Sequence, residues 1–314
     1  MTTINSARIF HGNNAEPHDF KLPPPPPWRQ RSAERRDERG NEFKPSDDMI
    51  EMVNAALLLR RPLLITGKPG TGKSSLIYAV ARELQLGPVL RWPVTSRATL
   101  KGALYEYDAI GRMQAANLND GKSDIGDFIR LGALGTALIP IDRPRALLID
   151  EIDKADIDLP NDLLDVFEEG EFEIPELSRL KDDKPVKVRT FDGNDYEVNK
   201  GRVRSNEFPF VILTSNGERD FAPAFLRRCL QLDVAEPTTE ELTRIVEAHL
   251  ADSFTETIKE QVEELIHAFV QKRTNQVLST DQLLNAVFLV GNERRSNERI
   301  EQIKATVLKQ LGSV

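Results

Sequence analysis

The chain has 314 residues, and 42 Lys and Arg against 50 Asp and Glu give a net charge of −8 at pH 7. This acidic excess disfavours a protein whose surface mainly contacts nucleic acid. No stretch approaches 18 consecutive apolar residues, and residues 1–8 lack a signal-peptide pattern, so the sequence predicts neither a membrane span nor secretion. A single cysteine, Cys229, and four scattered histidines predict a reducing, cytoplasmic location and no structural zinc.

The first 44 residues differ in composition from the rest of the chain. They contain six of the 19 prolines, including the run 23–27, and their net charge is +2. This composition predicts a disordered tail, in which the proline run is a stiff spacer rather than a ligand for an aromatic groove. The remaining 270 residues carry a net charge of −10 and form the folded, acidic part.

From residue 45 to about 236, short apolar runs alternate with helical segments. Ser46 is a candidate cap for a helix that extends through Leu57. The pattern is typical of an α/β domain with a mainly parallel sheet covered on both faces. The predicted strands are residues 62–66, 89–94, 146–150, 210–215 and 230–234.

Two further regions depart from this alternation. Residues 178–205 form an insert with alternating runs on either side of Asp192-Gly193, which predicts a β-hairpin. Between 178 and 204 the insert carries eight basic and five acidic residues, so it is a locally basic arm. Residues 237–314 show helical periodicity alone, which predicts a small all-helical domain with segments near 238–251, 257–273, 280–291 and 297–311.

The most specific motif is a glycine-rich run from Gly67 to Ser74 that matches G-x-x-x-x-G-K-[ST]. It follows the first predicted strand and precedes a helical run. In such a loop backbone N–H groups face phosphates, the lysine reaches the β and γ oxygens, and the hydroxyl joins a magnesium shell. The predicted nucleotide-binding residues are Gly67, Lys68, Pro69, Gly70, Thr71, Gly72, Lys73, Ser74 and Ser75, and Lys73 also has a catalytic role.

Polar residues follow two more predicted strands. Strand 146–150 ends in Asp150 and is followed by Glu151, while Asn216 follows strand 210–215. Because the carboxyl ends of parallel strands meet at one edge, we expect these residues near the loop. We predict that Asp150 and Ser74 hold Mg²⁺ and that Glu151 is the base for the attacking water. Asn216 is predicted to hold that water, or else to be a turn residue before Gly217.

Together these motifs resemble those of the AAA+ ATPases, and most closely the MoxR group. The segments that carry the finer resemblance are Leu131–Leu138, Asp150–Ala155 and Leu163–Gly170. The resemblance implies a P-loop three-layer sandwich with a five-stranded sheet in the order 5-1-4-3-2, and a small helical lid. It also implies a ring-shaped homo-oligomer, commonly a hexamer, with each nucleotide site at a subunit boundary.

The family's motifs can be assigned to positions in this chain. Residues 67–74 correspond to Walker A, Asp150 and Glu151 to Walker B, and Asn216 to sensor 1. Arg228 matches the family's arginine finger, and Arg227 is the runner-up for that role. The alternative interpretation is that the arginine forms an ordinary surface ion pair. At the expected sensor-2 position the chain has Asp281 instead of arginine, so a direct lid contact to the γ-phosphate is not predicted. Arg294 or Arg295 could substitute for it.

These features predict a Mg²⁺-dependent ATPase that remodels or activates a partner protein. The resemblance suggests a separately encoded client, of the von Willebrand A type. Two alternatives remain open from the residues alone. One is a nucleotide-gated binding switch with slow hydrolysis; the other is a nucleic-acid motor resembling the McrB-type ATPases, which would use the basic insert 178–204.

Overall fold

The computed structural model describes residues 43–117, 124–181, 184–250, 256–273 and 278–291, together with four single residues of the N-terminal segment, Asp19, Leu22, Pro25 and Pro26. Most of the predicted tail 1–44 and the predicted helical segment 297–311 therefore lie outside the described residues, as do Arg294 and Arg295. The chain divides into two compact units: the larger comprises residues 37–68 and 72–235, and the smaller includes residues 69–71 and the chain from residue 236 onward. None of the helices in the described ranges is long and apolar enough to cross a lipid bilayer.

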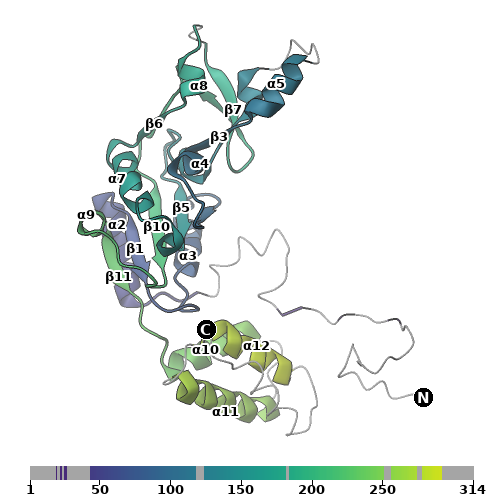
Figure 1. Ribbon diagram of the computed structural model, residues 1–314. Coiled ribbons are helices and arrows are strands. Elements are labelled where there is room, and N and C mark those ends of the chain that lie inside the picture. The colour runs from purple at the N-terminus through teal and green to yellow at the C-terminus, as the bar shows by residue number, and fades with distance from the viewer. Residues whose placement is uncertain are drawn as a thin grey trace. The chain divides into compact units, whose positions relative to one another are not determined.

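Five parallel strands form the central sheet of the larger unit (Figure 1). They lie in the order β11-β1-β10-β5-β2. Counted along the chain within this sheet, the order is 5-1-4-3-2, as predicted. The bounds are β1 (Leu63–Thr66), β2 (Leu90–Pro93), β5 (Ala146–Asp150), β10 (Phe210–Ser215) and β11 (Leu230–Asp233).

The register of the sheet brings three strand ends together. Thr66 at the end of β1 pairs with Ser215 at the end of β10, and Ile149 of β5 pairs with Leu213 of β10. The segments that follow β1, β5 and β10 therefore leave the sheet at the same edge. In open parallel sheets this carboxyl edge is where ligands bind.

Helices cover both faces of the sheet, so the predicted three-layer α/β arrangement is confirmed. Leu63 and Ile65 pack with helices of one face, and Leu64 and Leu147 pack with helices of the other, because successive side chains of a strand point to opposite sides. Burial on both faces explains why the strands have continuous apolar runs. The helices are α2 (Asp47–Leu59) and α3 (Ser75–Glu83) on one face, and α6 (Ala133–Ala137) and α7 (Leu159–Glu169) on the other.

A second sheet joins segments that are distant in the sequence. β7 (Val186–Arg189) and β8 (Asp195–Val198) form an antiparallel hairpin whose turn contains Gly193, with a φ of 86°. One parallel pair, Arg130 with Arg189, connects this hairpin to the antiparallel strands β3 (Tyr105–Tyr107) and β4 (Ile129–Leu131). The sequence predicted the hairpin but not its union with β3 and β4.

Shorter elements complete the larger unit. β6 (Glu171–Glu173) pairs antiparallel with β9 (Arg202–Arg204). The remaining elements are α4 (Leu100–Leu104), α5 (Ala109–Asn117), η3 (Ile125–Phe128), η4 (Ile152–Lys154), α8 (Pro175–Ser178) and α9 (Pro223–Leu226). Together with α5 and the second sheet, α8 lies at one end of this unit (Figure 1).

The regular elements described in the smaller unit are helices. It contains α10 (Thr239–Leu250), α11 (Glu256–Arg273) and α12 (Thr280–Gly291). Their apolar faces form a separate core that includes Leu242, Phe269 and Leu283. Fully burying one such side chain contributes roughly 1.5–3 kcal/mol. The helices therefore have their own hydrophobic core, as the periodicity of 3.6 residues predicts.

Cys229 gives a direct test of packing next to β11. Its side chain is buried, and burial raises the pKa of the thiol to about 12. Because the thiolate is the reactive form, we expect DTNB at about pH 8 to modify the native protein at least about 100-fold more slowly than protein unfolded in guanidinium chloride. Stopped-flow absorbance measures both rates. Equal rates in the two states would contradict the buried position.

Candidate functional site

The glycine-rich loop connects the end of β1 to the start of α3. Gly70 and Gly72 both have a φ of 82°, a conformation that residues with a side chain rarely adopt. A Cβ atom on Gly72 would also lie 2.8 Å from the ring of Phe43. Ser75 is the first residue of α3, and its N–H donates to the carbonyl of Gly72. Two positions of the predicted nucleotide loop, Gly70 and Gly72, therefore favour glycine for conformational reasons.

Ser74 precedes α3, but its side chain does not cap the helix. Its hydroxyl donates instead to Oδ1 of Asp150, over 2.8 Å. Asp150 ends β5, and its side chain is only 8% exposed. The structure thus brings together the two residues that were predicted to hold a metal.

Lys73 is buried, and its amine has three acceptors. Nζ donates to the carbonyls of Gly67 and Lys68 and, over 2.9 Å, to Oδ1 of Asn216. Burial lowers the pKa of Lys73, and attraction to nearby carboxylates, that of Asp153 first, offsets part of this shift. The amine therefore links the loop to the residue that follows β10.

The Asp150 carboxylate receives hydrogen bonds from three elements besides its own strand. Thr214 Oγ1 of β10 donates to Oδ1 over 2.8 Å, and Arg91 of β2 donates from Nε to Oδ2 over 3.0 Å and also from Nη2. Burial alone would raise the pKa of Asp150, but the hydrogen bonds from Arg91, Thr214 and Ser74 outweigh it and hold the pKa below its usual value. The group is therefore a carboxylate at neutral pH.

Glu151 has an unusual backbone for a residue with a side chain. Its φ and ψ are 63° and 51°, in the left-handed region, and its N–H donates to Thr214 Oγ1 over 2.9 Å. The carboxylate is about half exposed and accepts from Lys154 Nζ over 2.7 Å. Strain of this kind persists where the surrounding structure holds it, and it is frequent at functional sites.

Asn216 is held by its backbone as well as by Lys73. Its N–H donates to Oδ2 of Asp153 over 2.8 Å, and the N–H of Glu218 donates to the same oxygen. Asp153 is 3% exposed, and its other oxygen has no hydrogen-bond partner among the described residues. This carboxylate fixes the turn after β10, so the amide of Asn216 lies at the loop.

The two arginines after α9 are not bonded to this cluster. Arg228 donates from Nε to Glu168 of α7 and from Nη1 to the carbonyl of Ala224. Arg227 is exposed, and its carbonyl accepts from Arg61. Within the subunit Arg228 thus forms the surface ion pair that the sequence left as an alternative, and its action on a neighbouring subunit stays a prediction.

Three residues of the cluster were not assigned a role from the sequence. Asp153 follows Asp150 at a spacing of three, and Thr214 lies in the polar end of its strand. Arg91 is a charged residue inside an otherwise apolar predicted strand, a signal that could have singled it out. Because β2 lies at the edge of the sheet and leaves this side chain 47% exposed, nothing in the sequence required it to pair with a carboxylate.

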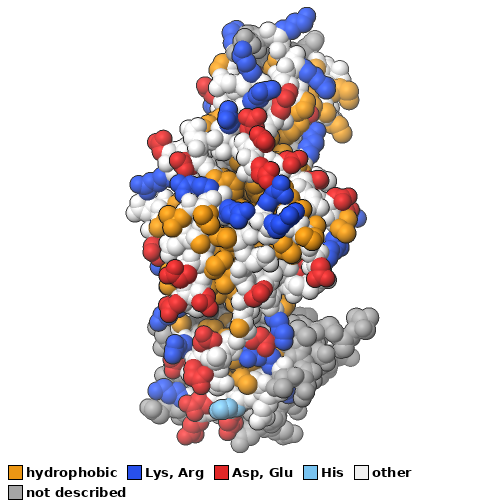
Figure 2. Space-filling view, turned by 90° about the vertical axis from the view of Figure 1, so that its left-hand side faces the viewer, with side chains coloured by type: hydrophobic (Ala, Val, Ile, Leu, Met, Phe, Trp, Pro, Cys, Tyr) orange, Lys and Arg blue, Asp and Glu red, His pale blue; other side chains and the backbone are white. Residues whose placement is uncertain are grey.

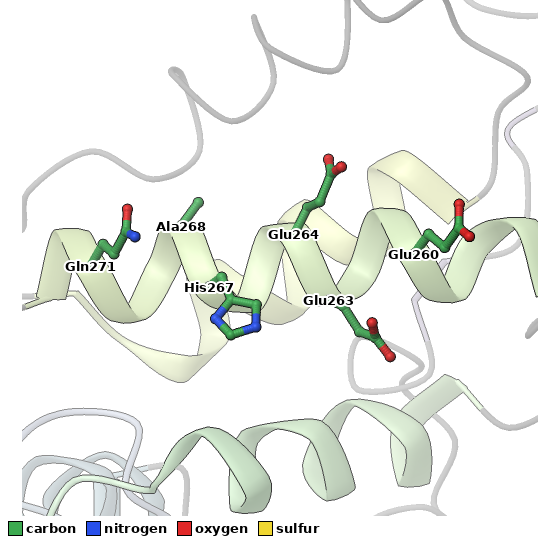
Figure 3. Close-up of a pocket in the computed structure, with 6 residues that line it drawn as sticks. All are labelled: Glu260, Glu263, Glu264, His267, Ala268 and Gln271. Atoms are coloured by element: carbon green, nitrogen blue, oxygen red, sulfur yellow. The ribbon is translucent and has the colours of Figure 1, made fainter.

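A surface hollow on α11 has an acidic lining, unlike the glycine-rich loop. It is lined by residues of one helix, α11, and three of them are glutamates (Figure 3). Carboxylates repel phosphate groups, so this hollow does not suit a nucleotide. Its lining consists of Glu260, Glu263, Glu264, His267, Ala268 and Gln271.

The left-handed backbone at Glu151 can be tested by stability. Glu151→Gly and Glu151→Ala both remove the carboxylate and its contact with Lys154, but only glycine adopts this backbone without a Cβ penalty. We expect the glycine variant to be more stable than the alanine variant by about 1 kcal/mol. Guanidinium unfolding followed by circular dichroism measures the difference. An alanine variant of equal or higher stability would show that this backbone is not strained.

Comparison with known proteins gives one family match. A family model described as the AAA domain of the dynein-related subfamily matches residues 62–229. No curated protein sequence matches the chain. A crystal structure of NtrX from Brucella abortus in complex with ADP is 15% identical with a TM-score of 0.42, and the match covers 83% of this chain and 54% of that one. The family match spans more than half of the chain and includes the loop, Asp150, Glu151 and Asn216, so the protein belongs to the AAA domain family, dynein-related subfamily.

Proposed function

We propose that this AAA+ protein is a Mg²⁺-dependent ATPase whose site lies at the carboxyl edge of the central sheet. The observation that carries the proposal is the hydrogen-bonded cluster that joins the loop to two strand ends. Ser74 bonds to Asp150 over 2.8 Å, and Lys73 bonds to Asn216 over 2.9 Å. A cation, a hydroxyl, a carboxylate and an amide thus converge where the glycine loop can hold phosphates.

The donor set fits the proposed ligands. Ser74, Asp150 and Thr214 contribute only oxygen atoms, which Mg²⁺ prefers. The backbone at Gly70 and Gly72 suits a loop whose N–H groups face phosphates. When bound, Mg²⁺ would supply positive charge that neutralises the phosphate oxygens.

The remaining residues would position and activate water. Asn216 is held through its backbone by Asp153, so its amide is pre-oriented. Lys154 donates to Oε2 of Glu151, which leaves Oε1 to accept a proton from water. Both side chains of that pair are more than 40% exposed, so the contact is weak and can exchange.

The finer assignment is a MoxR-like ATPase that works as a ring, a hexamer in the cytoplasm, and remodels a separately encoded client of the von Willebrand A type. Its support is the sequence resemblance. In such a ring Arg228, or Arg227, would reach the phosphates bound by the next subunit. Arg228 and Glu168 are both exposed by about 40–50%, so this ion pair could exchange for a phosphate contact.

The nucleic-acid motor has less support. Two basic residues of the insert are already paired with carboxylates, Lys187 with Asp195 and Arg204 with Glu171. Figure 2 shows a short band of Lys and Arg side chains on one face, with acidic side chains above and below it. A continuous basic surface would favour binding to a phosphate backbone more strongly. The nucleic-acid motor would be favoured if DNA or RNA stimulated the ATPase and if neutralising Arg189 and Arg202 abolished that stimulation.

The proposed base can be separated from the binding loop. We expect Glu151→Gln to bind ATP as wild type does but to hydrolyse it at least about 100-fold more slowly, because general-base catalysis contributes about that much. Lys73→Ala should weaken binding itself. Fluorescent-nucleotide titration and a phosphate-release assay measure the two effects.

Glu169→Gln is a matched control, because it makes the same change at an exposed position of α7. It should leave both the affinity for ATP and the rate of hydrolysis unaltered. Turnover at the wild-type rate in Glu151→Gln would refute the assigned base. Failure of the wild-type protein to bind ATP in the presence of Mg²⁺ would refute the proposed function.

A further inference from the structure

Arg91 makes a contact that the proposed ATPase mechanism does not use. Its guanidinium donates twice to Oδ2 of Asp150, from Nε over 3.0 Å and from Nη2. Oδ1 accepts from Ser74 and Thr214, each over 2.8 Å. A carboxylate offers about four acceptor positions, so the proposed metal ligand is already saturated.

The sheet register explains the contact. Arg91 pairs with Leu148 across the β2–β5 junction, two residues before Asp150, and side chains two residues apart share a face. β2 lies at the edge of the sheet, which leaves the Arg91 side chain 47% exposed, while that of Asp150 is 8% exposed. Arg91 can therefore move into solvent at small cost, whereas Asp150 is fixed.

A buried carboxylate without a partner is costly, so a cation at this position stabilises the site when no metal is bound. Lys73 does not fill this role, because its amine is bonded to the loop carbonyls and to Asn216. A second cation near the same carboxylate oxygens would be repelled by Arg91. The guanidinium and a metal ion are thus alternatives at Asp150.

We propose that Arg91 is an internal counter-ion of the metal site, which neutralises Asp150 before nucleotide binds and must release it when Mg²⁺ binds. This inference rests on the proposed function of Asp150. The release opposes Mg²⁺ binding, so Arg91 lowers the affinity of the site for the metal. The negative charge of the bound triphosphate then favours the exchange, which couples metal binding to nucleotide binding.

The test is the free Mg²⁺ concentration at the midpoint of the metal-dependent fluorescence change of a bound ATP analogue. It is measured in the Glu151→Gln background, so that turnover does not contribute. We expect Arg91→Gln and Arg91→Met to lower the midpoint by at least about fivefold, the lower end of typical coupling between sites. Arg91→Lys, which keeps the charge but not the fork of donors, should lie between them and the parent.

Arg97→Gln controls for the loss of one positive charge, because Arg97 is exposed and should leave the midpoint unaltered. Thermal melting verifies that each variant folds, and Arg91→Met keeps most of the aliphatic stem in case Arg91→Gln does not. An unchanged or higher midpoint in both folded Arg91 variants would overturn the exchange. An Asp150→Asn variant should bind the analogue without dependence on Mg²⁺. If the parent protein behaves in the same way, the proposed metal site is overturned, and the exchange with it.

Discussion

The site depends on one buried carboxylate, that of Asp150, at the end of strand β5 in the central sheet. An uncompensated charge in this position would destabilise the fold by several kcal/mol, so Asp150 needs donors from its surroundings. They come from the glycine loop, from β10 and from β2, through Ser74, Thr214 and Arg91. By satisfying one charge, these side chains fix the relative positions of three neighbouring segments. The loop that suits phosphates is thereby held against the strand end that suits a metal.

A second set of contacts orders the residues around that carboxylate. Thr214 bonds both to Asp150 and to the N–H of Glu151, so one hydroxyl aligns both acidic residues. Asp153 holds the N–H of Asn216, whose amide oxygen accepts from Lys73. These groups lie on or next to regular elements, which limits their motion. Such preorganisation is what charge stabilisation in phosphoryl transfer requires.

Much of the arrangement could be predicted because it depends on local pattern. The five apolar runs became the strands of the central sheet, and the predicted cap Ser46 does accept a hydrogen bond from the N–H of Met49. The loop and the residues after β5 and β10 lie together because parallel strands end at one edge. The strand order came from the resemblance to a family, since pattern alone does not determine which strands are neighbours.

The parts that could not be predicted depend on contacts between distant segments. β3 and β4 have three residues each, too few for a clear alternation, and β4 joins the hairpin through one pair 59 residues apart, Arg130 with Arg189. The partner of Arg91 depends on the register of β2 against β5. Likewise, the Arg228–Glu168 pair depends on how α9 meets α7. Periodicity and spacing carry no information on such contacts.

The most direct test of this account is an experimental structure of the Glu151→Gln protein with ATP and Mg²⁺. We expect the β- and γ-phosphates to lie on the loop 67–74 beside Lys73, with the metal at Ser74 and Asp150 and the amide of Asn216 facing the γ-phosphate. Nucleotide bound at another place, or a metal held without either Ser74 or Asp150, would contradict the account.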